Sequence, residues 1–208
     1  MTKRSRQRAA SRETSPQAKS KQEHHEIFTP NRLIIMFLVL WLLIVALMFP
    51  TFRGRWHMNR GHDAMKRGDF PTAYKHYTWL GKHTDAPDSA SFNLEMGNIC
   101  LALQHFDEAI PYLKNAVYKT KGQKSTYSLL GLAYLKLGKI PEAKDFFTRE
   151  LEKNPTDPLA NFHMGDLAFK DKQYSEAMAY FSRVAYLPGY KETLKPYWNT
   201  IEKEVLTR

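Results

Sequence analysis

The sequence predicts an all-α protein: an α-solenoid of four helix-turn-helix repeats, preceded by one transmembrane helix and closed by a C-terminal capping helix. Three observations support this prediction. A four-residue motif occurs four times, and its closing alanines advance by 36, 34 and 34 residues. A glycine precedes each of these alanines by twelve residues. An uninterrupted run from Leu33 to Phe49 contains no charge, glycine or proline. Self-similarity at this period is typical of repeat architectures, so it is considered before any local pattern.

The two small residues of the repeat indicate close helix packing. Each unit is expected to have one helix that carries the glycine, a tight turn, and a second helix that carries the alanine. A glycine inside a helix costs roughly 1 kcal/mol relative to alanine, so four in register require a reason. We expect the backbone of the partner helix to pass over each glycine. The glycines are Gly61, Gly97, Gly131 and Gly165, and the alanines are Ala73, Ala109, Ala143 and Ala177.

Larger apolar residues are placed to fill the space around these contacts. One set precedes three of the glycines, and another follows each alanine by four residues. Pro71 and Pro141 lie where a second helix would start, and proline is tolerated at that first helical position. The filling residues are Met96, Leu130 and Met164 in the first set, and Tyr77, Leu113, Phe147 and Phe181 in the second.

This pattern resembles the tetratricopeptide repeat family, which implies a right-handed solenoid. By that register the units are 54–87, 90–123, 124–157 and 158–191. The first unit is the weakest match, because His57 and Arg60 stand where the family prefers bulky apolar side chains. The third unit is the best match, with Tyr127, Leu130, Gly131, Tyr134, Gly138, Ala143, Phe147 and Pro155.

The N-terminal part of the chain predicts a basic tail followed by a membrane anchor. Residues 1–27 contain almost no large apolar side chain, so we expect disorder there. A helix over 33–49 would span about 25 Å, against a bilayer core of about 30 Å. The anchor is therefore predicted over 28–52, with a helix start at Thr29-Pro30-Asn31 and a stop at Pro50. The end of this segment offers no small-x-small cleavage site, which argues against a signal peptide.

The charge distribution favours one orientation of this anchor. Eight Lys and Arg residues precede it, which predicts a cytoplasmic N-terminus and repeats on the non-cytoplasmic side. The corresponding localisation is a bacterial inner membrane with periplasmic repeats. The opposite orientation stays open, because the close flank after the anchor is itself rich in arginine and lysine.

The residues after the fourth unit, 192–208, predict an amphipathic capping helix. Leu194, Trp198, Ile201 and Val205 recur every three or four residues on one face. Solenoids need a terminal element with a polar outer face. The alternative is that this helix docks onto a partner.

Catalysis, cofactor binding, metal binding and nucleic-acid binding are not predicted. The sequence contains no HExxH motif, no Gly-rich phosphate loop and no Gly-x-Ser-x-Gly elbow. The net charge of +10 is divided between the tail and the repeats, and the basic residues of the repeats alternate with acidic ones. Nucleic-acid binding would instead gather them on one face. The single cysteine, Cys100, falls at a core position and is expected to be a small buried hydrophobe.

The resemblance also implies a binding groove, because the first helix of each unit lines the concave side in this family. Exposed contiguous apolar area of that kind usually marks a docking site. Two possibilities stay open: an open groove, or one covered by the superhelix and the terminal helix. The predicted groove residues are Met58, His62, Met65, Leu94, Asn98, Leu101, Leu132, Leu135, Lys136, Phe162, Asp166 and Phe169.

The function that follows is a single-pass, membrane-anchored adaptor that binds partner proteins in this groove and assists assembly of a membrane complex. Two alternatives are a self-associating array on the membrane and a regulatory subunit of a membrane enzyme. Members of the family that bind chaperone tails hold a terminal carboxylate with Lys, Asn and Arg. That clamp is not predicted here, since the matching positions carry Met58, His62, Glu95, Ser125 and Leu129.

Overall fold

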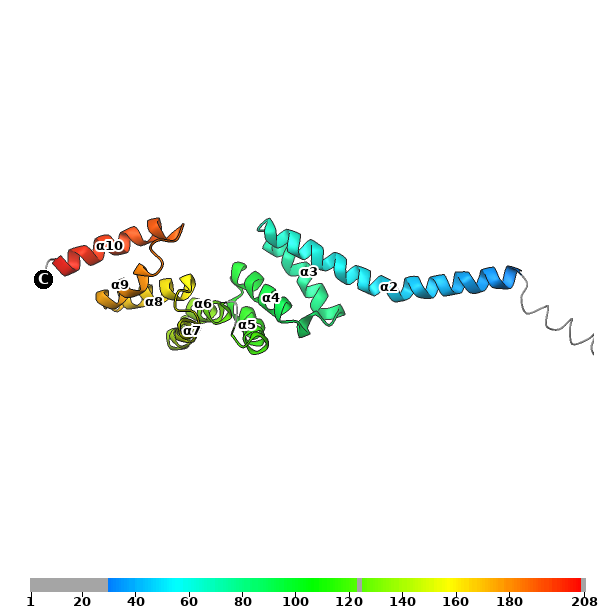
Figure 1. The fold of residues 1–208 in the computed structure, drawn as a ribbon, viewed down its shortest axis with the longest axis horizontal. Coiled ribbons are helices and arrows are strands. Elements are labelled where there is room, and N and C mark those ends of the chain that lie inside the picture. The colour runs from blue at the N-terminus through cyan, green and yellow to red at the C-terminus, as the bar shows by residue number, and fades with distance from the viewer. Residues whose placement is uncertain (1–29, 123–124, 207–208) are drawn as a thin grey trace, which may run out of the picture. The chain divides into compact units, whose positions relative to one another are not determined.

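The structure is a computed structural model that describes residues 30–122 and 125–206 (Figure 1). This part of the chain is helical and contains no strand. Its long helices are α2 (Pro30–Lys66), α3 (Phe70–His83), α4 (Ala90–Ala102), α5 (Phe106–Thr120), α6 (Thr126–Lys136), α7 (Ile140–Lys153), α8 (Pro158–Lys170), α9 (Tyr174–Ser182) and α10 (Tyr190–Leu206), with a short 3₁₀ turn η1 (Ala86–Asp88).

The described residues belong to two compact units, one ending at Arg53 and one beginning at Gly54. The apolar stretch of α2 lies in the first unit. Among the described helices, α2 is the one that is long and apolar enough to cross a membrane, and none of its apolar stretch is buried. The predicted tail, 1–27, and the first two residues of the predicted anchor lie outside the described residues.

The helix stop predicted at Pro50 is wrong, since α2 continues through this proline to Lys66. A proline inside a helix removes one backbone donor and weakens the helix, but it ends the helix only where the neighbouring residues also favour a turn. Here no glycine or asparagine lies beside it, and the Thr51 hydroxyl donates to the Met48 carbonyl at 2.7 Å. The helix that carries the apolar run is therefore also the first helix of the first repeat.

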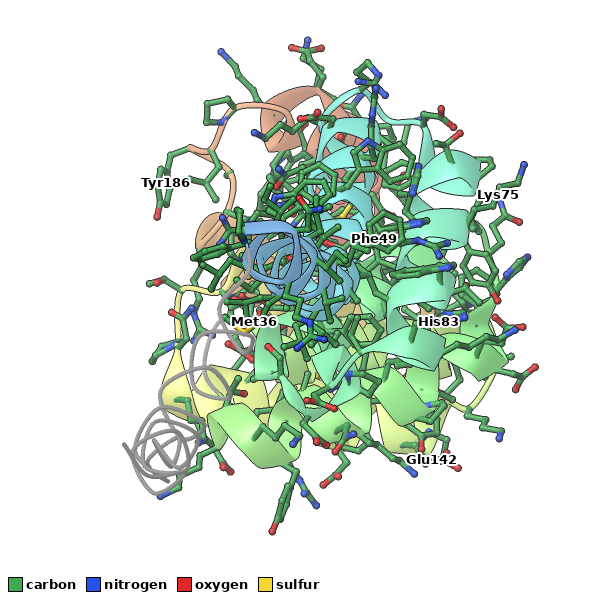
Figure 2. All side chains as sticks on the ribbon, turned by 90° about the vertical axis from the view of Figure 1, so that its right-hand side faces the viewer. Met36, Phe49, Lys75, His83, Glu142 and Tyr186 are labelled. Atoms are coloured by element: carbon green, nitrogen blue, oxygen red, sulfur yellow. The ribbon has the colours of Figure 1, made fainter. Side chains whose placement is uncertain are left out.

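The second unit is a right-handed solenoid of helical hairpins. The pairs α4–α5, α6–α7 and α8–α9 each pack as one hairpin, and the second helix of a hairpin packs against the first helix of the next. First helices also contact one another, α4 with α6 and α6 with α8, and together they form one layer of the ribbon. Exposed side chains such as Lys75 on α3 and Tyr186 between α9 and α10 project outward from the helices (Figure 2).

The repeated glycines make the predicted close contact, but the atoms that approach belong to a side chain and not to the backbone of the partner helix. A Cβ added at Gly131 would lie 2.8 Å from Cε1 of Phe147, and one at Gly165 would lie 2.5 Å from Cε1 of Phe181. Tyr77 and Leu113 occupy the same place over Gly61 and Gly97. The side chain four residues after each alanine thus fills the notch that the glycine leaves. The four alanines are themselves fully buried.

The turns inside the hairpins share one backbone conformation. Gly68 and Gly138 both have a φ of 74°, a left-handed value that glycine adopts without steric cost. Gln104 and Lys172 take the equivalent place in the other two hairpins, with φ of 62° and 59°. Asp69 then caps α3 by accepting a hydrogen bond from the backbone N–H of Thr72 at 3.1 Å, which satisfies one of the free donors at the helix start.

Replacing a notch glycine tests this packing. We expect Gly131→Ala to lower the free energy of unfolding by about 1–3 kcal/mol, because overpacking against Phe147 outweighs the gain in helix propensity. Urea unfolding of the full chain in detergent, followed by circular dichroism, measures the change. The double variant Gly131→Ala/Phe147→Leu should lose less than the sum of the two single changes. Additive losses would contradict the contact.

Candidate partner-binding groove

A row of apolar side chains recurs at one position of the first helix in every unit. Counting from the first residue of each unit (54, 90, 124 and 158), this row is position 12 throughout. Each member is half-buried and packs against the core beneath it. We call it the apolar row, and it consists of Met65, Leu101, Leu135 and Phe169.

A row of cations lies beside the apolar row. Position 13 is lysine in three units, Lys66, Lys136 and Lys170, and Ala102 in the second; all four are exposed. Lys170 pairs with Asp166 at 2.7 Å. We call these three residues the lysine row. Of these three lysines, only Lys136 is among the groove residues predicted from the sequence.

The first two units are joined by a polar network at the groove. Nε2 of His62 lies 3.2 Å from both carboxylate oxygens of Glu95, and the hydroxyl of Tyr77 donates to the same carboxylate. Burial and this hydrogen bond raise the pKa of Tyr77. The network joins α2, α3 and α4, so His62 and Glu95 are committed to contacts within the protein. Met58, one turn earlier on α2, is exposed.

The fourth unit is partly covered by α10. The Tyr197 hydroxyl donates to Asp166 at 2.8 Å, and its ring lies 4.9 Å from that of Phe169, edge to face. Phe162 lies 5.5 Å from Tyr190. A cleft of about 520 Å³ remains between α8 and α10. It is lined by Asp166, Phe169, Lys170, Thr193, Pro196, Tyr197 and Thr200.

The predicted groove residues are therefore not equivalent. Phe162 lies within the ring cluster of the last hairpin and α10, whereas Leu94, Asn98 and Leu132 are half-buried on α4 and α6.

His163 is a half-buried residue that was not among the predicted groove or core positions. Its ring stacks on Phe147 of the preceding unit at 5.5 Å, and its buried Nδ1 has no hydrogen-bond partner among the described residues. Burial lowers its pKa to about 4. Its place in the repeat could have identified it, because it occupies position 6, the same position as Glu95 in the second unit.

The described residues contain no group of three or more His, Cys, Asp or Glu side chains that converge as metal ligands. Two histidines do meet in the first hairpin, where Nδ1 of His57 lies 2.9 Å from Nδ1 of His76. His57 also stacks on Trp79 at 3.9 Å. Burial and the nearby Arg60 lower the pKa of His76. This pair packs α2 against α3.

These features define a class of protein: an α-solenoid built of helical hairpins. A profile of the tetratricopeptide repeat matches residues 58–124 and 128–190. The chain belongs to the tetratricopeptide repeat family.

Two curated proteins illustrate the similarity. The chain is 27% identical over 154 residues to the Hsp70-Hsp90 organizing protein of Triticum aestivum, covering 74% of this chain and 26% of that protein. It is 29% identical over 112 residues to Protein O-mannosyl-transferase TMTC2 of Homo sapiens, covering 52% of this chain and 13% of that protein. The chain thus spans about a quarter or less of the length of these relatives.

Solved structures share the fold. A crystal structure of MamA aligns with a TM-score of 0.58 at 21% identity, covering 70% of this chain and 85% of that chain. A tetratricopeptide repeat protein from Parabacteroides merdae aligns with a TM-score of 0.55 at 18% identity, covering 65% and 54%.

The buried His163 predicts a pH dependence of stability. A histidine whose pKa is lower in the folded than in the unfolded protein binds fewer protons when folded, so stability falls as pH drops below about 6.5. We expect a loss of about 2 kcal/mol at pH 5 relative to pH 8. Urea unfolding of wild type and His163→Phe at each pH isolates this contribution as a difference. Parallel stability profiles for the two proteins would show that His163 is not the cause.

Proposed function

We propose that this protein is a membrane-anchored adaptor that binds partner proteins along the groove of its repeats. The observation that carries the proposal is the unbroken apolar row at position 12, flanked by exposed lysines at position 13. Half-buried apolar side chains that continue through four units offer a long strip of surface for a partner to cover. Surfaces of this kind mark docking sites when they are contiguous.

The lysine row sets the chemistry of the partner. We infer an amphipathic segment whose apolar side chains cover the apolar row while its carboxylates face Lys66 and Lys136. A helix with anchors every three or four residues meets this requirement, as does an extended segment. Charge complementarity of this kind contributes more to specificity and association rate than to affinity.

A free C-terminal carboxylate is not the feature that this groove would recognise. The relative from Triticum aestivum is named for its chaperone partners, but the carboxylate clamp of chaperone-tail binders is not matched here. One clamp position carries the acidic Glu95, which is bonded to His62 and Tyr77. A second carboxylate placed beside Glu95 would be repelled.

The apolar stretch of α2 supports membrane anchoring. Its side chains between Ile34 and Phe49 are exposed and almost all apolar, and a surface of that kind is stable when lipid covers it. Because the anchor and the repeats belong to one chain, anchoring would confine the groove to the membrane. Confinement raises the effective concentration of a partner in the same membrane toward the millimolar range, so a modest groove affinity suffices.

Reversing the charge of two lysines in the lysine row should change which peptides bind. Phage-displayed amphipathic peptides of varied charge are selected on the full chain in detergent, with wild type and Lys66→Glu/Lys136→Glu as targets. We expect wild type to enrich acidic peptides and the variant to enrich basic ones, because both lysines are exposed beside the apolar row.

The matched control for this selection is Lys75→Glu/Lys82→Glu. It makes the same change in net charge on α3, where both lysines are exposed. The control should select the same peptides as wild type. Identical peptides for wild type and the Lys66/Lys136 variant, or a charge switch in the control, would place recognition elsewhere.

The anchor and its orientation are tested in sealed membranes. We expect the full chain to stay in the membrane pellet during alkaline carbonate extraction, and a variant lacking 33–49 to be released. For an N-terminus on the cytoplasmic side, protease added outside right-side-out vesicles should degrade 54–208. Protection of the repeats in intact vesicles, with cleavage after permeabilisation, would reverse the orientation.

A further inference from the structure

The last helix, α10, packs as the first helix of a fifth unit that begins at residue 192. At three junctions, those of Tyr77 with Glu95, Phe147 with His163 and Phe181 with Tyr197, the residue at position 24 contacts the residue at position 6 after it. Phe147 stacks on His163 at 5.5 Å, and Phe181 lies 4.8 Å from Tyr197. Positions 3 and 10 of α10, Leu194 and Ile201, are buried, as they are in the second, third and fourth units. The helix is therefore docked in register.

The face of α10 that would pack against a second helix has no such helix among the residues that the structure describes. In a complete unit this face comprises positions 4, 7, 8 and 11, which on α10 are Lys195, Trp198, Asn199 and Glu202; we call it the terminal face. Position 11 is fully or almost fully buried in the four complete units, where it is Ala64, Cys100, Tyr134 and Ala168.

Apolar surface surrounds the terminal face. Met178 on α9 is 43% exposed and Val205 on α10 is 54% exposed. A shallow cavity of about 360 Å³ lies between the two helices. Its lining is Met178, Trp198, Ile201, Glu202 and Val205.

An ordinary second helix does not fit this face. In the four complete units position 8 is glycine, and its notch receives a large side chain from the second helix. Position 8 of α10 is the exposed Asn199, so α10 has no glycine notch at this place. The expected packing partner is thus a helix without the usual large residue.

We propose that the terminal face binds the terminal face of a second copy of this chain, with the two α10 helices antiparallel. Lys195 and Glu202 are seven residues apart and lie on the same side of the helix. A two-fold axis midway between Trp198 and Asn199 places each lysine opposite the partner's glutamate. It also places each Trp198 beside an asparagine of the other copy. The contact is self-complementary, as a two-fold interface requires.

The charges favour this pairing over the alternatives. A parallel pair of helices would place lysine against lysine and glutamate against glutamate, which is unfavourable. Lys195 already pairs with Glu192 at 2.6 Å within its own chain, whereas Glu202 has no ion-pair partner among the described residues. The antiparallel contact supplies one. This inference is independent of the groove, because the terminal face lies outside it.

A charge exchange tests the proposal. The full chain in detergent micelles is examined by multi-angle light scattering over a range of concentrations. We expect wild type to form dimers, and Lys195→Glu or Glu202→Lys to raise the dissociation constant about tenfold, since each change disrupts both symmetric ion pairs. The double variant Lys195→Glu/Glu202→Lys should recover close to the wild-type value. Within one chain these residues are too far apart to pair, so recovery reports contact between chains.

The matched control is Glu204→Lys, which makes the same charge change at an exposed position outside the terminal face. It should dimerise like wild type. A wild type that stays monomeric at all concentrations overturns the proposal. So do single variants that dimerise normally, and so does a double variant that is no better than the single ones. Capture of a different protein by this face, with no dimer, also overturns it.

Cysteine cross-linking in lipid vesicles gives a second measurement that does not depend on charge. Variants Lys195→Cys and Glu202→Cys are reconstituted separately and together, while the native Cys100 is buried. Disulfide-linked dimers should form only in the mixture. In a dimer of one variant, the two cysteines would lie about 10 Å apart along the antiparallel helices, which is too far for a disulfide. Cross-links in either variant alone, or none in the mixture, contradict the antiparallel pairing.

Discussion

The side chain at position 24 of each unit holds the solenoid together. It fills the glycine notch of its own first helix. In the first, third and fourth units it also contacts the helix that follows the hairpin. Phe147 lies over Gly131 and stacks on His163, and Phe181 lies over Gly165 and contacts Tyr197. One large residue therefore stabilises both the hairpin and its junction. Repeat proteins depend on such nearest-neighbour contacts because no unit can bury its apolar face alone.

The sequence predicted the helical hairpins and their order because the period is set by this packing. Glycine and alanine must recur wherever the helices approach, so their spacing identifies the units without any local propensity. The atoms that make the contact were not predictable, because spacing does not distinguish a backbone from a side chain. The continuation of α2 past Pro50 was missed for a related reason. A proline weakens a helix, but the neighbouring residues decide whether it ends there.

The groove could be predicted only as a set of positions. Register identifies which residues lie on the inner side, but it does not show which of them are already bonded. Asp166 is engaged by Tyr197, 31 residues away, and that contact depends on how α10 docks. Glu150 on α7, outside the groove, is another residue whose surroundings the register does not show. It is a buried carboxylate at a core position, and burial and the nearby Asp157 raise its pKa. Its neighbours come from other elements, so its burial is visible only in three dimensions.

The position of α10 separates the two surfaces that it helps to form. Tyr197 faces the cleft beside Phe169, whereas Glu202 lies five residues later and therefore about 140° away around the helix. A second copy bound to the terminal face would contact the side of α10 that points away from the groove. Pairing would therefore leave both grooves accessible, and two tethered grooves bind a two-site partner more tightly than one. A helix that only capped the solenoid would need a polar outer face and no particular spacing of charges.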